Sequence, residues 1–445
     1  MNTLARLALF ILLAVMPARA IAQPPKDKAA LAVKENHCAT CHGNSDVMPE
    51  VQQGRYYVSE KHLAGDIHWQ KGLRCYDCHG GDPTTTNKSK AHFPDAPYRE
   101  IKEIGPRDIP EFCGRCHSDV QYMRHYQPSP RTDQLSEYWT SSHGKQLKAT
   151  GDPQVAVCTS CHGGKHKLIA VRNLESPVYI TRIAKTCAGC HSDAKIMAGR
   201  QYHGRPLGHN QYDEWQQGVH GKALAKGDLS APACNRCHGN HGAVPPDVDS
   251  VANVCGSCHG KVAKLFASTR MKHQFEEAGL PGCATCHGNH LIRTPTDEML
   301  GMGEKAVCAK CHAQGQHGAT LAGAAVARSL RAQLDELNQL IAEANANVAQ
   351  AERLGMDVSS PRFDLRKALN ARVNARTLIH SFAPGPVEKA LAEGIQTASA
   401  VKERADAALE EHTARRTWLA VSLAPIAVVV VFLLFYIRRL GMPTA

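Results

Sequence analysis

The sequence predicts a mostly α-helical and irregular fold with little β-sheet, arranged in three successive parts. The five-residue motif C-x-x-C-H occurs nine times between Cys38 and His312. Cysteine is absent after residue 311, and a stretch rich in Ala, Leu, Arg and Glu follows. That stretch leads into residues 418–437, which are twenty uncharged and mostly apolar residues. We expect an elongated repeat array, a long helical hairpin or three-helix bundle, and one C-terminal transmembrane helix.

Residues 1–22 have the features of a secretory signal peptide. Arg6 precedes an apolar run over residues 7–16, and Ala18-Arg19-Ala20 and Ala20-Ile21-Ala22 offer small-residue cleavage sites. The apolar run is too short to cross a bilayer, so cleavage is favoured over anchoring. We expect export to the periplasmic side of the cytoplasmic membrane and a mature chain that begins at residue 23.

C-x-x-C-H is the signature of covalent c-type haem attachment. The two thiols bond to the haem vinyl groups, and the adjacent histidine binds the iron as its proximal ligand. The nine motifs, numbered 1 to 9 in chain order, use all eighteen cysteines, so no thiol remains for a disulfide or a zinc site. The predicted attachment residues are Cys38 and Cys41, Cys75 and Cys78, Cys113 and Cys116, Cys158 and Cys161, Cys187 and Cys190, Cys234 and Cys237, Cys255 and Cys258, Cys283 and Cys286, and Cys308 and Cys311. The predicted proximal ligands are His42, His79, His117, His162, His191, His238, His259, His287 and His312.

Nine covalently bound c-type haems agree with the composition. Residues 38–312 provide about 30 residues for each haem, and aromatic residues make up only 5% of the chain, so the haems themselves would form the core. The formal charge of +11 would otherwise suggest a nucleic-acid partner. The haem propionates supply up to eighteen negative charges, and guanidinium groups pair well with carboxylates, so we reject that interpretation.

The haem-binding part contains an internal repeat with two motifs per copy. The segment CGRCHSDVQYM (113–123) matches CAGCHSDAKIM (187–197), and QLSEYWTSSHGKQLKATGD (134–152) matches QYDEWQQGVHGKALAKGD (211–228). The offset between Cys158 and Cys234 is 76 residues, and a compressed third copy covers residues 255–290. Repeats of this kind stack into arrays, which predicts one nonahaem domain over residues 23–317.

Sixteen further histidines are available as distal iron ligands. His68, His143, His220 and His273 lie shortly before a motif, and the glycine after His143 and His220 would let backbone approach a flat macrocycle closely. His166, His241 and His290 follow their own proximal histidine too closely to reach the opposite haem face, so they should bind neighbouring haems. His62 and His380 complete the predicted set of nine. The remaining alternatives are His37, His92, His125, His203, His209 and His317, and the thioethers of Met48, Met123, Met197 and Met271.

Residues 318–416 form the predicted helical domain. Leu330, Leu334, Leu337 and Ile341 follow a 4-3-4 spacing that is typical of one apolar helix face. Gly355 should end the first helix, Ser360 and Pro361 should begin the second as N-cap and first residue, and the prolines at 384 and 386 should separate a third. His412 is interpreted as a surface residue.

Residues 417–438 form the predicted transmembrane anchor. Twenty residues span about 30 Å as a helix, which matches the hydrocarbon thickness of a bilayer. Arginine pairs at 415–416 and 438–439 flank the run, and Trp418 and Tyr436 lie near its ends. Given export of the N-terminal part, residues 439–445 form a short cytoplasmic tail. The alternative interpretation is a buried core helix.

The nine motifs, the histidines before them and the CHGNH endings resemble the multihaem cytochromes c with doubled C-x-x-C-H motifs, including membrane-bound members of that superfamily. Hydroxylamine oxidoreductase and the multihaem nitrite reductases are architectural relatives. The resemblance covers about residues 37–317, with two departures. Nitrite reductases of this type often carry C-x-x-C-K at the active haem, whereas every motif here ends in histidine. Hydroxylamine oxidoreductase has eight haems and a tyrosine cross-link, for which this chain offers no assignable residue.

Two functions follow from these features. The first is a membrane-anchored electron carrier between a quinone-linked or cytochrome b-type membrane oxidoreductase and a periplasmic redox partner. The second is an enzyme of the hydroxylamine oxidoreductase or nitrite/tetrathionate reductase type with one open haem. Because histidines are abundant enough to fill both axial positions of every haem, the sequence favours the carrier, and no catalytic residue is assigned.

Overall fold

The computed structural model describes residues 36–48, 56–95, 99, 102–164, 166–247 and 250–441. The predicted signal peptide and residues 442–445 of the predicted tail lie outside these ranges. The described chain is mostly helical, and its only strands are β1 (Gln201–Tyr202) and β2 (Arg205–Pro206), which pair antiparallel. The predicted fold class, mostly α-helical and irregular with little sheet, is confirmed.

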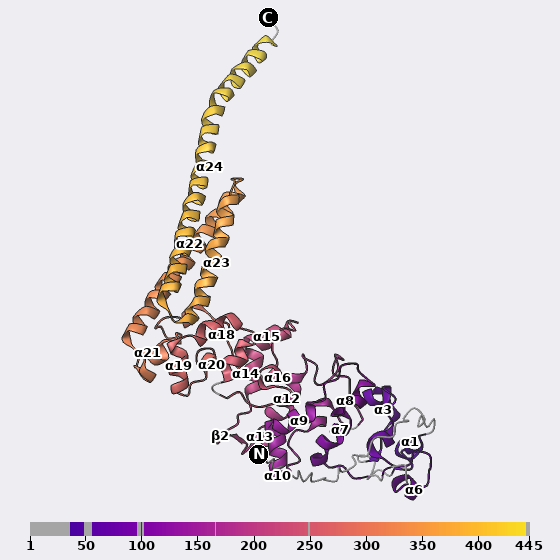
Figure 1. Cartoon of the computed structure of the whole chain (residues 1–445). Coiled ribbons are helices and arrows are strands. Elements are labelled where there is room, and N and C mark those ends of the chain that lie inside the picture. The colour runs from indigo at the N-terminus through magenta and orange to yellow at the C-terminus, as the bar shows by residue number, and fades with distance from the viewer. Residues whose placement is uncertain are drawn as a thin grey trace, which may run out of the picture. The chain divides into compact units, whose positions relative to one another are not determined.

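The chain divides into two compact units (Figure 1). The first comprises residues up to Leu135 together with Leu147–Ser176. Its helices are α1 (His37–His42), α3 (Glu60–Gly65), α4 (Ile67–Gln70), α5 (Cys75–His79), α6 (Lys88–His92), η1 (Pro106–Asp108), α7 (Ile109–His117), α8 (Val120–Arg124) and α11 (Cys158–His162). Two helices, α9 (Gln134–Thr140) and α10 (Ser142–Thr150), are divided between the units.

The second unit comprises Ser136–Gln146 and residues from Pro177 onwards, and it holds motifs 5 to 9 and the helical domain. Its motif-bearing part contains α12 (Ile183–His191), α13 (Ala194–Met197), α14 (Gln211–Gln217), α15 (Val219–Ala225), α16 (Cys234–His238), α17 (Val251–Gly256), α18 (Gly260–Ala267), α19 (Arg270–Glu277), α20 (Gly282–His287), η3 (Asp297–Met299), α21 (Ala309–His312) and η4 (Gln316–Gly318).

The even-numbered motifs share one local structure. Each forms a single helical turn that ends at the motif histidine, and each is followed by a glycine with positive φ: Gly80 (86°), Gly163 (96°), Gly239 (87°) and Gly288 (79°). This backbone conformation costs other residues about 1–2 kcal/mol, which explains the CHG sequence at these four places. The chain therefore turns sharply after each even proximal histidine.

Apolar packing in the motif-bearing part of the second unit is sparse. Its described buried cluster consists of Ala184, Leu224, Ala231 and Ala233. Three of these four residues are alanines, so they remove little apolar surface from water. Such a core is small for the length of chain it supports, as expected if haems fill the space between the short helices.

The helical domain is a three-helix bundle with an ordinary apolar core. It is formed by α22 (Leu321–Arg353), α23 (Ser359–Leu378) and α24 (Pro384–Leu440), with η5 (Ile379–Ser381) before α24. The predicted apolar face of α22 is confirmed: Leu330, Leu334, Leu337 and Ile341 are all buried in this core. At Gly394 of α24 the backbone comes so close that an added Cβ would lie 3.0 Å from Leu337 Cδ2.

The turn between α22 and α23 agrees only in part with the prediction. Gly355 has φ 78° and its N–H donates to Glu352 O, while the Met356 N–H donates to Ala351 O. This pair of bonds is the Schellman ending expected of a C-terminal glycine. The second helix begins two residues early, at Ser359 instead of Pro361, because the N–H of Ser359 is held by Asp357 Oδ1 at 3.0 Å, so Ser360 is not the N-cap.

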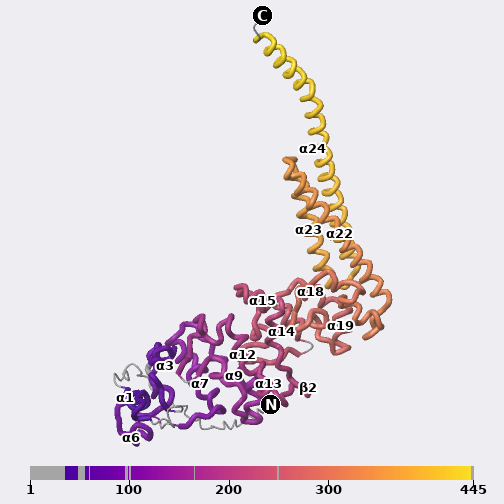
Figure 2. Tube along the Cα trace, turned by 180° about the vertical axis from the view of Figure 1, so that it is seen from behind, coloured from indigo at the N-terminus to yellow at the C-terminus, as the bar shows by residue number. Residues whose placement is uncertain are grey.

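Helix α24 runs without interruption from the bundle through the predicted anchor (Figures 1 and 2). Its first part packs on α22 and α23 through residues from Val387 to Ala405. Its apolar C-terminal part is long enough to cross a membrane, and none of that window is buried by protein. The alternative of a buried core helix therefore does not fit.

Candidate haem-binding sites

The motif cysteines approach one another in a regular order. Within each unit, the first cysteine of an odd motif hydrogen-bonds the first cysteine of the next even motif. These pairs are Cys38–Cys75, Cys113–Cys158, Cys187–Cys234 and Cys255–Cys283. The bond from Cys38 lowers the pKa of the Cys75 thiol to about 6, and the bond from Cys255 lowers the pKa of Cys283 to about 7. Motifs that are adjacent in the sequence are therefore adjacent in space within these pairs.

These cysteines suit haem attachment better than zinc binding. All eighteen lie within the described residues, and none of them forms a disulfide. A zinc site needs about four convergent ligands. In the described part of the chain, no group of three or more His, Cys, Asp or Glu side chains converges on a point that could hold a metal ion. Among these residues the thiols of different motifs therefore meet in pairs and not as the four ligands of a zinc site.

Histidine rings face one another in pairs that fit a haem iron between them. A metal–imidazole bond measures about 2.0 Å, and the nitrogen lies about 1.1 Å from the ring centre, so two rings on opposite sides of one iron have centres about 6 Å apart. Seven such pairs, each joining a motif histidine to a histidine outside the motifs, occur among the described residues. They are His42–His92 (6.0 Å), His117–His68 (6.0 Å), His79–His166 (5.8 Å), His191–His143 (6.0 Å), His259–His220 (6.4 Å), His238–His290 (6.0 Å) and His287–His380 (6.1 Å).

Backbone carbonyls fix the outer nitrogen of several of these rings. Because a carbonyl only accepts, the Nδ1 atom must carry the proton, and Nε2 is left with its lone pair for iron. Motif histidines and their partners share this arrangement. The Nδ1 bonds are His42 to Tyr56 O (2.9 Å), His92 to Lys88 O (2.7 Å), His238 to Val244 O (3.2 Å), His380 to Thr377 O (3.1 Å) and His312 to Thr320 O (2.9 Å).

Burial favours the neutral form of several of the paired imidazoles. It lowers the pKa of His79 and of His143 to about 4, and it lowers the pKa of His191 and His290 below the usual value as well. Iron binds the neutral imidazole, so the site selects the ligating form at physiological pH.

A recurring backbone hydrogen bond positions the histidines that precede a motif. The donor is the N–H of the residue just before such a histidine. The acceptor is a carbonyl further along the chain, two residues after a histidine that itself follows a later motif. The three bonds are Ile67 to Leu168 O (2.8 Å), Ser142 to Ala243 O (3.0 Å) and Val219 to Ile292 O (2.7 Å). The bond therefore ties His68 to the His166 loop, His143 to the His241 loop and His220 to the His290 loop.

The glycines after His143 and His220 allow close packing between helices, and their predicted approach to a macrocycle stays a prediction. A Cβ on Gly144 would collide with Tyr138 O, and a Cβ on Gly221 would collide with Trp215 O. Both oxygens belong to the helix that precedes the histidine, so the described close approach is of helix to helix. This close packing sets the direction in which each histidine leaves its helix.

Asp66 supports the first of these sites and was not identified from the sequence. Its carboxylate is buried and accepts hydrogen bonds from the N–H of His68 at 2.8 Å and of Leu168 at 3.0 Å. Burial opposes ionisation, but these bonds and the His68 side chain lower its pKa overall. Its signal in the sequence is an aspartate two residues before the histidine, which also caps helix α4.

The other predicted distal histidines have different surroundings. The side chain of His273 is 70% exposed, with Nδ1 3.4 Å from Glu277 Oε1. His62 is half-buried and close enough to His166 to lower the pKa of that ring. His241 places Nδ1 3.6 Å from Glu137 Oε2.

Two histidines stand out for other reasons. His92, which the sequence placed only among the alternatives, faces His42 from α6. No repeat copy marks it, so only the fold could identify it. His166 has φ 59°, a left-handed backbone that is strained for histidine and typical of functional sites.

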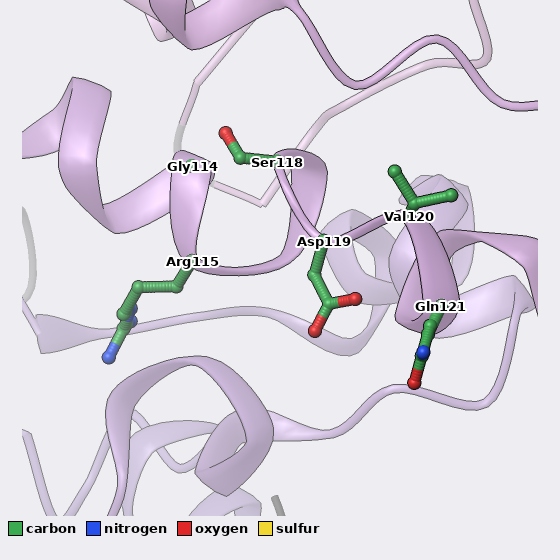
Figure 3. Close-up of a pocket in the computed structure, with 6 residues that line it drawn as sticks. All are labelled: Gly114, Arg115, Ser118, Asp119, Val120 and Gln121. Atoms are coloured by element: carbon green, nitrogen blue, oxygen red, sulfur yellow. The ribbon is translucent and has the colours of Figure 1, made fainter. Parts of the chain in front are cut away.

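A hollow lies beside motif 3 and is lined by Gly114, Arg115, Ser118, Asp119, Val120 and Gln121 (Figure 3). The guanidinium of Arg115 lies 4.6 Å from the centre of the Phe112 ring and donates to Cys78 O at 2.8 Å. Arg99 also donates to Cys78 O, at 3.3 Å. Two guanidinium groups beside the attachment residues of motif 2 suit the propionates of a bound haem.

Comparison with known families supports the haem assignment. Residues 229–313 match the family model described as cytochrome c3, and this stretch contains motifs 6 to 9. It covers about a fifth of the chain. No curated protein and no solved structure matches the chain significantly. The matched part is of the multihaem cytochrome c type, which binds c-type haem and transfers electrons.

Proposed function

We propose that this chain is a membrane-anchored, periplasmic nonahaem cytochrome that relays electrons between a quinone-linked or cytochrome b-type membrane partner and a periplasmic redox partner. The observation that carries the proposal is the set of seven histidine pairs whose ring centres lie 5.8–6.4 Å apart. When bound between such rings, haem iron supplies one-electron oxidation and reduction. An iron with two imidazole ligands has no position left for a substrate, which favours a carrier over an enzyme.

The residues divide the work in a regular way. The motif cysteines hold each haem covalently, and the motif histidine provides one axial ligand. A histidine that precedes an even motif provides the second ligand for the next odd motif, as His68 faces His117 and His220 faces His259. A histidine that follows an even motif faces the even motif before it, as His290 faces His238.

This register assigns His273 as the second ligand at His312. His220 and His259 are 39 residues apart, and so are His273 and His312. The two segments lie close together, because a Cβ on Gly318 would be 3.3 Å from Gln274 Oε1. The N–H of Lys272, before His273, is bonded by Thr269 Oγ1 at 3.1 Å, whereas the equivalent residues in earlier copies bond to a later repeat. No C-x-x-C-H motif follows His312 in this sequence, so the segment of His273 has no later repeat to bond to.

The bundle replaces that missing repeat at the end of the array. By the same rule, His287 of motif 8 would face a histidine that follows the next even motif, but the sequence has no tenth motif. Its partner is instead His380 of η5, and the two ring centres lie 6.1 Å apart. Phe382 supports the same junction by packing on Phe266, with ring centres 6.2 Å apart. The helical domain thus acts as a terminal cap of the repeat array as well as a membrane attachment.

Electron paramagnetic resonance of the fully loaded, oxidised protein tests the proposal. We expect low-spin ferric signals from all nine haems and no spectral change on adding cyanide or nitrite. A high-spin signal that one of these ligands converts to low-spin would indicate an open haem and would favour the enzyme. A pyridine haemochrome assay on the same sample supplies the haem count.

A further inference from the structure

Helix α24 sets the distance between the haem-binding residues of its unit and the membrane. Residues 384–417 lie between the start of the helix and the apolar run. At 1.5 Å per residue these 34 residues extend about 50 Å. Transmembrane helices tilt by about 20° on average and up to about 40°, so a continuous helix still rises about 40–50 Å above the hydrocarbon.

The bundle makes most of this length rigid. Val387, Leu391, Ala398 and Ala405 of α24 are all at most 1% exposed in the core shared with α22 and α23. The far end of the bundle is closed by Arg404, whose guanidinium donates to Asp364 Oδ2 at 2.8 Å and to Ser360 Oγ at 3.2 Å. From Leu409, the last residue of α24 packed on this core, to Trp418 only about 13 Å of helix remains unsupported.

The haem-binding residues of this unit lie at the opposite end of the stalk. His380 is four residues before the start of α24, and its ring faces His287 of motif 8. His312 of motif 9 packs against Gly323 in the first turn of α22. Helices α18 and α19 lie beside this base, and both views show α12 to α15 away from the C-terminal end of α24 as well (Figures 1 and 2).

We infer that the bundle is a spacer for the haems at its base, and that the membrane-side partner of these haems is a protein that carries its own redox centre about 40–50 Å out from the bilayer. The inference rests on the proposed anchor and haems. Electron transfer falls off exponentially with distance, so a quinol inside the bilayer cannot reduce a haem at the base of the stalk. The oxidation of quinol to quinone, which releases two electrons and two protons, takes place in the partner. The partner's haem or iron–sulfur centre then passes one electron at a time to this chain.

The full-length, haem-loaded protein in nanodiscs tests this spacing. The bilayer contains anionic lipid and a lipid with a nitroxide on its headgroup, and the relaxation rate of the nitroxide is measured with the ferric protein present and in matched nanodiscs that carry no cytochrome. Ferric haem is paramagnetic, so a haem close to the bilayer raises the rate above that of the cytochrome-free nanodiscs. A basic monohaem cytochrome c adsorbed on the same bilayer is the positive control. We expect the haems at the base of the stalk to leave the rate at its cytochrome-free value, because dipolar relaxation falls with the sixth power of distance.

The same nanodiscs loaded with an isoprenoid naphthoquinol provide the second readout. We expect the haems to stay oxidised with quinol alone and to be reduced fully by dithionite. Relaxation enhancement above the cytochrome-free nanodiscs, or reduction of the haems by quinol without a partner, would overturn the spacer and leave the electron-relay proposal intact. A chain that fails to remain with the nanodisc would overturn the anchor, and the spacer with it.

Discussion

The replacement of His380 by alanine tests whether the bundle supplies an iron ligand to the haem of motif 8. His380 contributes a ring 6.1 Å from that of His287, and its Nδ1 bonds to Thr377 O, so the side chain is held in the ligating orientation. Alanine removes the imidazole and leaves a space that water can fill. One of nine haems should become high-spin, which corresponds to about one ninth, or 11%, of the haem iron.

The measurement is quantitative electron paramagnetic resonance of the oxidised protein. His380→Ala should add a high-spin signal that integrates to about one haem per chain, and millimolar imidazole should convert that signal back to low-spin. His380→Met should keep the haem low-spin and raise its potential, because methionine ligation raises the potential of a haem. His412→Ala, a substitution in the same helical domain, is the matched control and should leave the spectrum unchanged.

The bundle itself should survive the substitution. Its core is formed by residues such as Leu334, Leu337, Leu391 and Val401, and His380 is not part of this core. The helical circular dichroism of His380→Ala should therefore match the parent. A His380→Ala protein with the parental low-spin spectrum and no imidazole response would refute the reasoning, because it would show that this histidine binds no iron.

Four further outcomes follow from the structure. A pyridine haemochrome assay should return nine haems per chain, and seven or fewer in fully matured protein would contradict the assignment of the motifs. His220→Ala should add a high-spin component of one haem, since its ring is 6.4 Å from that of His259, and unchanged midpoint potentials would exclude it as a ligand. Truncation before Arg415 should release a cytochrome with an unchanged visible spectrum, and continued membrane attachment would point to another anchor. Gly394→Val should lower the stability of the bundle by about 1–3 kcal/mol through overpacking against Leu337, with Ala392→Val at an exposed position of the same helix as a control, and thermal unfolding followed by circular dichroism measures the difference.

Local features were predictable from the sequence, because they depend on residues close together in the chain. The buried face of α22, its ending at Gly355 and the apolar length of α24 all follow from spacing within one helix. The second helix was placed two residues late, because the bond that the N–H of Ser359 donates to Asp357 Oδ1 competes with a cap at Ser360.

Which histidines face each other was not predictable, because each pair joins residues tens of positions apart. His68 and His220 occupy equivalent positions before their motifs, so the repeat identified them as candidate iron ligands. The histidines that they face could not be inferred in this way. His92 belongs to no repeat and faces His42 only because α6 lies beside α1 in the folded unit. Asp66 was missed for the same reason, since one of its bonds is to Leu168, 102 residues away.

The contacts between cysteines of different motifs have a consequence for biosynthesis. Cys38 and Cys75, and likewise Cys255 and Cys283, lie within hydrogen-bonding distance in the folded chain. In an oxidising compartment, two thiols this close would be oxidised to a disulfide if the chain collapsed before its haems were attached. Such a bond would join two motifs and remove one attachment point from each. If the haems are attached in such a compartment, the order of events is constrained: at least one cysteine of each close pair must carry its thioether before the two motifs come together.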